Sequence, residues 1–120
     1  MTPMSPVERV RHRSLMLLRR LRPHREHVVV RFRGDLTADT IVDTHRVLRT
    51  ALRDVPEVLV VDLSRVTHLS PDGAVVLLLA VRAARAQKTR LEITGARAQT
   101  AVVIRQTGLE RYLSHGPLDR

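Results

Sequence analysis

The chain has 120 residues, of which 43% are hydrophobic, and its 21 Lys and Arg outnumber 12 Asp and Glu to give a net charge of +9. This length suits one domain with a core that needs neither a disulfide nor a metal. The absence of cysteine excludes thiol nucleophiles and thiolate metal sites and suits a cytoplasmic protein. The longest apolar run, residues 74–81, is too short to span a bilayer.

The positive charge is concentrated at the start of the chain. Residues 1–33 hold nine arginines against two glutamates, so seven of the nine net charges lie there. Residues 1–13 combine two prolines with alternating charge and lack a sustained apolar period. We therefore predict a flexible basic tail over residues 1–13.

Two apolar runs, residues 14–21 and 27–33, predict a β-hairpin at the start of the folded domain. They are separated by a turn that contains Pro23, which cannot sit in a central strand. In the second run, alternate residues should face the core: Val28, Val30 and Phe32. The Gly-Asp-Leu-Thr sequence at residues 34–37 should end this strand.

A first helix should follow, because Thr37 is a favoured N-cap and apolar or packing residues recur at helical spacing, at Ile41, His45, Leu48 and Leu52. Pro56 marks its end. The uninterrupted apolar run from Val58 to Asp62 predicts a central strand buried on both faces. A polar turn is expected over residues 64–68. Asp62, just before this turn, suits the end of the strand.

The second helix has a well-defined start. Ser70 is a favoured N-cap, Pro71 suits the first helical position, and Asp72 places a negative charge at the positive end of the helix dipole. The helix should run through residues 74–87. Its first two turns are apolar nearly all round, so a partner or a neighbouring helix must cover a second face.

The rest of the chain predicts a short strand at residues 90–94, a third helix at 98–106 stopped by Gly108, a final turn at 109–113, and a loose C-terminus at 114–120. The order β-β-α-β-α-β-α indicates a single α/β domain over residues 14–113. Its mixed sheet of about four strands should be parallel in its later part, with helices packed against it.

Four segments of this sequence resemble the STAS family, in its anti-sigma-factor-antagonist type. They are Gly34-Asp35-Leu36, Val60-Val61-Asp62-Leu63-Ser64 followed by Val66, Leu69 to Gly73, and Thr107-Gly108-Leu109. The resemblance implies a cytoplasmic switch that binds an anti-sigma factor with serine-kinase activity, releases the sigma factor, and is turned off by phosphorylation.

The resemblance also places the family's Asp-Ser-Ser-Gly acceptor loop on this chain. The family's Asp falls on Ser70, its acceptor serine on Pro71, its next serine on Asp72 and its glycine on Gly73. Pro71 cannot accept a phosphate, so the usual switch should be degenerate. Asp72 is either a partial phosphate mimic or a dipole partner, and Ser70 is either a displaced acceptor or a structural N-cap.

By the same resemblance, the partner surface includes the loop and one side of the second helix. Its candidate residues are Leu69, Ser70, Pro71, Asp72, Gly73, Val76 and Ala80, with Asp35 and Thr37 from the first segment. Thr37 replaces an acidic residue of the family. The alternative is that the helix residues belong to the internal core.

Neither catalysis nor a cofactor is expected. The six histidines are scattered, at 12, 24, 27, 45, 68 and 115, without metal-ligand spacing, and there is no glycine-rich phosphate loop or Gly-x-Ser-x-Gly elbow. His45 is better explained as a half-buried packing residue than as a ligand. The arginines would attract the phosphates of a nucleic acid. However, Phe32 and Tyr112 are the only aromatic residues, so side chains on which bases could stack are nearly absent.

We therefore expect a non-enzymatic regulatory domain that binds an anti-sigma factor or a serine-kinase partner. The first alternative is a STAS scaffold or sensor subunit that no longer switches. The second is a basic domain that binds nucleic acid.

Overall fold

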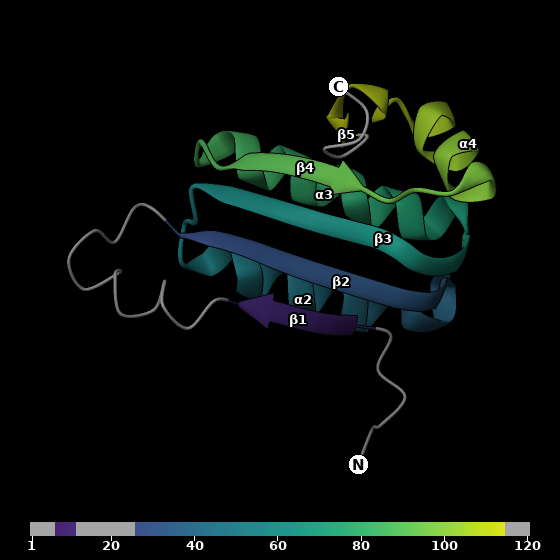
Figure 1. The fold of residues 1–120 in the computed structure, drawn as a ribbon, viewed down its shortest axis with the longest axis horizontal. Coiled ribbons are helices and arrows are strands. Elements are labelled where there is room, and N and C mark those ends of the chain that lie inside the picture. The colour runs from purple at the N-terminus through teal and green to yellow at the C-terminus, as the bar shows by residue number, and fades with distance from the viewer. Residues whose placement is uncertain (1–6, 12–25, 115–120) are drawn as a thin grey trace, which may run out of the picture.

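A computed structural model describes residues 7–11 and 26–114 of the chain. In these residues a five-stranded sheet has the order β1-β2-β3-β4-β5, in which β1 is antiparallel to β2 and all other neighbours are parallel. The strands are β1 (Val7–Arg11), β2 (His27–Leu36), β3 (Val58–Leu69), β4 (Arg90–Thr94) and β5 (Leu113–Ser114). The helices are α2 (Ile41–Arg53), α3 (Pro71–Ala86) and α4 (Ala98–Thr107), with short 3₁₀ turns η1 (Ala38–Thr40) and η2 (Glu110–Tyr112). The predicted mixed α/β domain is confirmed (Figure 1).

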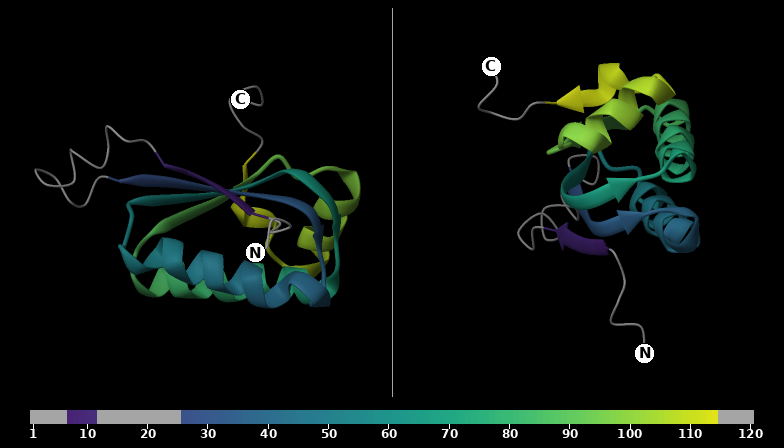
Figure 2. Two further views of the ribbon diagram at one scale, coloured as in Figure 1. Left: turned by 90° about the horizontal axis from the view of Figure 1, so that it is seen from below. Right: turned by 90° about the vertical axis from the view of Figure 1, so that its right-hand side faces the viewer.

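The helices lie on one face of the sheet. Because the parallel strands follow one another in sequence order, crossovers of one hand place every connecting helix on the same side. Figure 2 shows α2 and α3 side by side beneath the sheet, with α4 toward one end. The expectation that the central strand is buried on both faces is wrong, because Val60 and Asp62 point to the face opposite the helices and are half-buried among the described residues.

The core fills the space between the sheet and these helices. The predicted alternation in β2 is confirmed, since Val28, Val30 and Phe32 are fully buried. Aliphatic residues of β3, α3 and β4 complete this layer. Among them are Leu59, Val61 and Leu63 of β3, Leu77 of α3 and Ile93 of β4. A core with one aromatic side chain is therefore built from branched aliphatic residues, which suit strands and pack closely.

Two strands run further than their sequence predicts. β2 continues through Leu36, and β3 continues through residues 64–68, which were expected to form a polar turn. The two extensions pair with each other as far as Leu36 opposite Leu69, across register shifts on either side of Gly34. Gly34 has φ +78°, which favours glycine, and bulges of this kind let a strand continue past an irregular residue.

The ends of the domain also differ from expectation. β1 lies at residues 7–11, inside the segment expected to be a tail, while the strand expected at residues 14–21 lies outside the described residues. A short edge strand needs no apolar period of its own when its backbone pairs with a long neighbour such as β2. At the other end β5 adds a short parallel strand after the expected turn.

Candidate functional site

The segment at residues 69–73, called the loop below, consists of the last residue of β3, the N-cap Ser70 and the first turn of α3. It lies at the edge where the parallel strands end, the edge at which α/β sheets usually bind ligands. It is attached to β2 because the Ser70 amide donates to the Leu36 carbonyl at 2.9 Å. It is attached to α4 because the Gln99 side chain donates to the Leu69 carbonyl at 3.0 Å and accepts from the Leu69 amide at 3.1 Å. Contacts on two sides thus fix the backbone of the loop.

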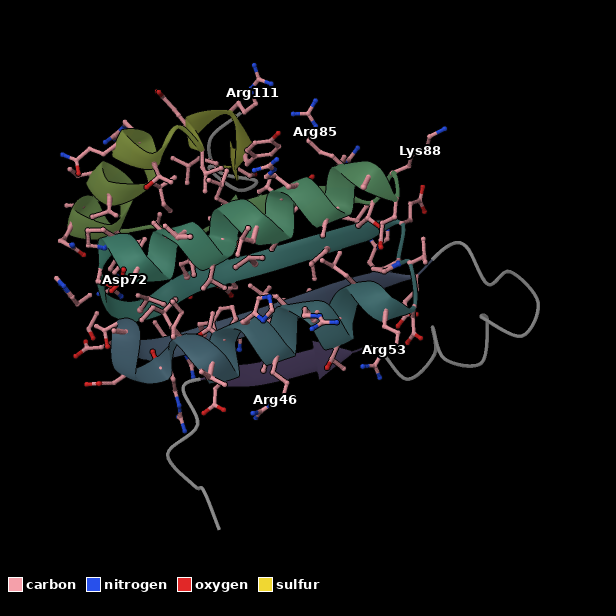
Figure 3. All side chains as sticks on the ribbon, turned by 180° about the vertical axis from the view of Figure 1, so that it is seen from behind. Arg46, Arg53, Asp72, Arg85, Lys88 and Arg111 are labelled. Atoms are coloured by element: carbon pink, nitrogen blue, oxygen red, sulfur yellow. The ribbon has the colours of Figure 1, made fainter. Side chains whose placement is uncertain are left out.

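The start of α3 has the expected capping. The Ser70 hydroxyl oxygen accepts a hydrogen bond from the Gly73 amide at 3.1 Å, Pro71 occupies the first helical position, and Asp72 lies in the first turn. The structural reading of Ser70 as an N-cap is therefore confirmed. Pro71 and Asp72 are both exposed, and Figure 3 shows Asp72 at the end of α3. A carboxylate placed there complements the helix dipole.

Gly73 is fully enclosed where α3 meets β2. A Cβ atom at this position would lie 2.6 Å from the Leu36 carbonyl oxygen and 2.9 Å from Leu69 Cδ1. Both distances are shorter than van der Waals contact, so only glycine lets the helix start this close to the end of β2. Gly73 therefore has a packing role and offers no side chain to a partner.

A second segment, at residues 35–40, lies against the first and comprises the end of β2, Thr37 and η1, which leads into α2. Thr37 and Thr40 form a capping box, in which the Thr37 hydroxyl oxygen accepts from Asp39 and the Thr40 hydroxyl oxygen accepts from the Thr37 amide. The Asp35 carboxylate accepts a 2.7 Å hydrogen bond from the Thr67 hydroxyl of β3. Thr37 thus caps η1, the turn that leads into α2, whereas the N-cap of α2 itself is Thr40. Asp35 links the two strands.

The face of α3 that the sequence proposed as a partner surface is turned into the core. Val76 and Ala80 are only 3% and 5% exposed, and what remains accessible of them lines a groove between α2 and α3. Val76 and Ala80 are buried because α3 packs against both the sheet and α2, and they lie on the side of α3 that makes these contacts. Their neighbours Val75 and Leu79 are 47% and 45% exposed and take that place on the surface.

On the face of the sheet opposite the helices, Asp62 and Arg31 form an ion pair at 3.0 Å. Burial raises the pKa of Asp62, but hydrogen bonds from the Ser64 backbone and side chain, together with Arg31, outweigh it and hold the pKa below the ordinary value of 3.8. Asp62 therefore lies inside a strand instead of at the strand end that the sequence indicated, and its ion pair ties β2 to β3.

The described residues do not assemble a metal centre. They contain no group of three His, Cys, Asp or Glu side chains that could hold an ion. His45 is half-buried beside α3, as a packing residue would be. No helix in the described part of the chain is both long and apolar enough to cross a membrane.

Gln99 is the residue of this site that the sequence did not reveal. It lies in α4, 30 positions from the loop residue it holds, and an exposed glutamine in a helix carries no signal of such a contact. Gln99 would have been found only through the tertiary position of α4.

Comparison with known proteins gives a consistent result. The family model described as "Mlab, STAS domain" matches residues 20–115. No curated protein is a significant match by sequence. Among solved structures, an anti-sigma factor antagonist from Mycobacterium paratuberculosis is 20% identical over 99% of this chain and 94% of its own, with a TM-score of 0.74.

The anti-sigma factor antagonist SpoIIAA, in its unphosphorylated form, is 20% identical over 75% of this chain and 79% of its own, with a TM-score of 0.66. The Bacillus cell fate determinant SpoIIAA in its phosphorylated form is 20% identical over 75% of this chain and 82% of its own, with a TM-score of 0.62. At this identity the likeness establishes a shared fold.

Proposed function

The chain belongs to the STAS domain family, and from this membership we propose that it is a non-enzymatic, cytoplasmic regulatory domain that binds an anti-sigma factor or a related serine-kinase protein. Solved structures of the same fold include anti-sigma factor antagonists, which supports this class of partner. The contact surface that we propose is the loop at residues 69–73 with the adjacent start of α3.

The observation that carries the proposal is the rigid attachment of an exposed loop. Ser70 is bonded to the end of β2, Leu69 is bonded to Gln99, and Gly73 packs against both strands, yet Pro71 and Asp72 remain exposed between these anchors. A surface held in one conformation loses little entropy when a partner binds it. Such a loop suits recognition of another protein.

We further propose that phosphorylation of this loop does not switch the domain. The position that the STAS resemblance gives to the acceptor is Pro71, which has no hydroxyl group. The Ser70 hydroxyl is engaged in capping α3. The Asp72 carboxylate supplies a permanent negative charge at the helix start, smaller than that of a phosphate. The same observation favours the second candidate, a scaffold or sensor subunit that holds its partner permanently.

A two-step experiment tests the proposal. The protein is first used as bait in its native cell, and the captured partner is identified and purified. Wild type and Pro71→Ser are then incubated with that partner and labelled ATP. We expect no label on wild type and one phosphate on Pro71→Ser, because this change restores a hydroxyl at the first helical position. Label on Ser70 of the wild type would refute the loss of the switch, and capture of nucleic acid without a protein would refute the partner class.

A further inference from the structure

The exposed surface of α2 carries a row of arginines. Arg46, Arg49 and Arg53 recur at helical spacing behind Val42, and all four side chains are exposed. Figure 3 shows Arg46 and Arg53 projecting from the same helix. Arg46 contacts Asp43 at 3.0 Å, whereas within the described part of the chain Arg49 and Arg53 make no ion pair. The row therefore keeps most of its positive charge.

The exposed surface of α3 carries a parallel apolar row. Val75, Leu79 and Ala83 recur every four residues, so they lie on one side of the helix, and all three are exposed. Arg82 lies beside the last of them. This row explains why α3 is apolar nearly all round: its inner residues belong to the core, while the outer row is covered by nothing in the described part of the chain.

A groove lies between α2 and α3, and Arg49 is the member of the arginine row that lines it. Four residues of each helix line it: His45, Leu48, Arg49 and Leu52 from α2, and Val76, Leu79, Ala80 and Ala83 from α3. The two helices run side by side in the same direction (Figure 3), so a helix laid along the groove would contact Leu79 and Ala83 on one side and Arg49 on the other. From Val42 to Arg53 a helix rises about 16 Å, which three turns of another helix would match.

We propose that this groove binds one amphipathic, acidic helix of the partner protein. Its apolar side chains contact Val75, Leu79 and Ala83, and its carboxylates face the arginine row. The inference rests on the proposed function and names the chemistry of the partner. A helix fits because it offers an apolar row and a charged row side by side, which is the helix-in-groove mode of recognition. A nucleic acid would not need the apolar row.

The test is selection from a library of helical peptides displayed on phage, with the full-length protein as target. We expect the recovered peptides to carry apolar residues at helical spacing and acidic residues beside them. Their affinity should fall at least tenfold for Leu79→Asp and for the double change Arg46→Glu and Arg49→Glu. It should be unchanged for Arg111→Glu, which reverses an exposed arginine outside the groove.

Three results would overturn the inference. These are recovery of basic peptides, recovery of peptides whose binding ignores the groove variants, and tighter binding of duplex DNA or of vesicles with anionic lipid than of any peptide. Circular dichroism and thermal unfolding of each variant exclude loss of the fold as the cause.

The same variants separate this inference from the proposed function. If the captured partner still binds Leu79→Asp with wild-type affinity but fails to bind a loop variant, the groove proposal is wrong and the proposed function stands. If neither the native cell nor the library supplies a protein or peptide that binds, both fail.

Discussion

Replacing Gly73 with alanine should destabilise the protein, although the same change usually stabilises a helix. Alanine is favoured over glycine inside a helix by about 0.5–1 kcal/mol. Here the added Cβ would lie 2.6 Å from the Leu36 carbonyl oxygen. This oxygen cannot move away easily, because it belongs to the backbone and accepts a hydrogen bond from the Ser70 amide. Forcing an atom into a filled site costs about 1–3 kcal/mol, so we expect Gly73→Ala to lower the free energy of unfolding by about 1–2 kcal/mol.

Urea unfolding followed by circular dichroism measures this change, and the dependence of free energy on urea should stay the same. The midpoint of thermal unfolding should fall by several degrees, since about 4–8 °C accompanies each kcal/mol in a domain of this size. Gly108 is a matched control: it has φ +87° and open space around it, so asparagine there should cost little, whereas asparagine at Gly73 should cost at least as much as alanine. A Gly73→Ala protein more stable than wild type would refute the close packing of α3 on β2.

Three further changes test the contacts around the site. Gln99→Ala should cost about 1 kcal/mol and speed amide hydrogen exchange in the loop it holds, whereas Gln106→Ala, an exposed glutamine of the same helix, should do neither. Ser70→Ala should lower the free energy of unfolding by about 1 kcal/mol, and Ser70→Asp should restore most of it by capping α3; equal stability of all three would contradict the cap. Asp62→Asn should destabilise at neutral pH by weakening the contact with Arg31. Because the folded-state pKa of Asp62 is lowered, its contribution is complete above the ordinary pKa of 3.8 and is lost as the pH falls below it, so wild type and variant should converge there.

Local signals in the sequence were sufficient for most of the elements. The start of α3 is encoded by three adjacent residues, Ser70, Pro71 and Asp72, whose preferences agree, and the structure places it there. The alternation of β2 and the apolar run of β3 were equally local. By contrast, the extension of β3 through residues 64–68 depends on pairing with β2 across a bulge, which no local pattern encodes.

The candidate site shows the same division. Its capping residues were predicted from chemistry that acts within one turn. The exposed face of α3 was predicted one residue out of place, with Val76 and Ala80 in the positions that Val75 and Leu79 occupy. An all-apolar helix gives no contrast between its inner and outer faces, so its rotation is set only by packing against the sheet.

The affinity of the purified partner for wild type, Asp72→Lys and Glu110→Lys tests the central claim most directly. Both changes replace an exposed acidic residue with lysine, one at the start of α3 and one in η2. If the loop at residues 69–73 is the contact surface, calorimetry should show at least a tenfold weaker Kd for Asp72→Lys and an unchanged Kd for Glu110→Lys. Equal affinities for all three proteins would contradict the account.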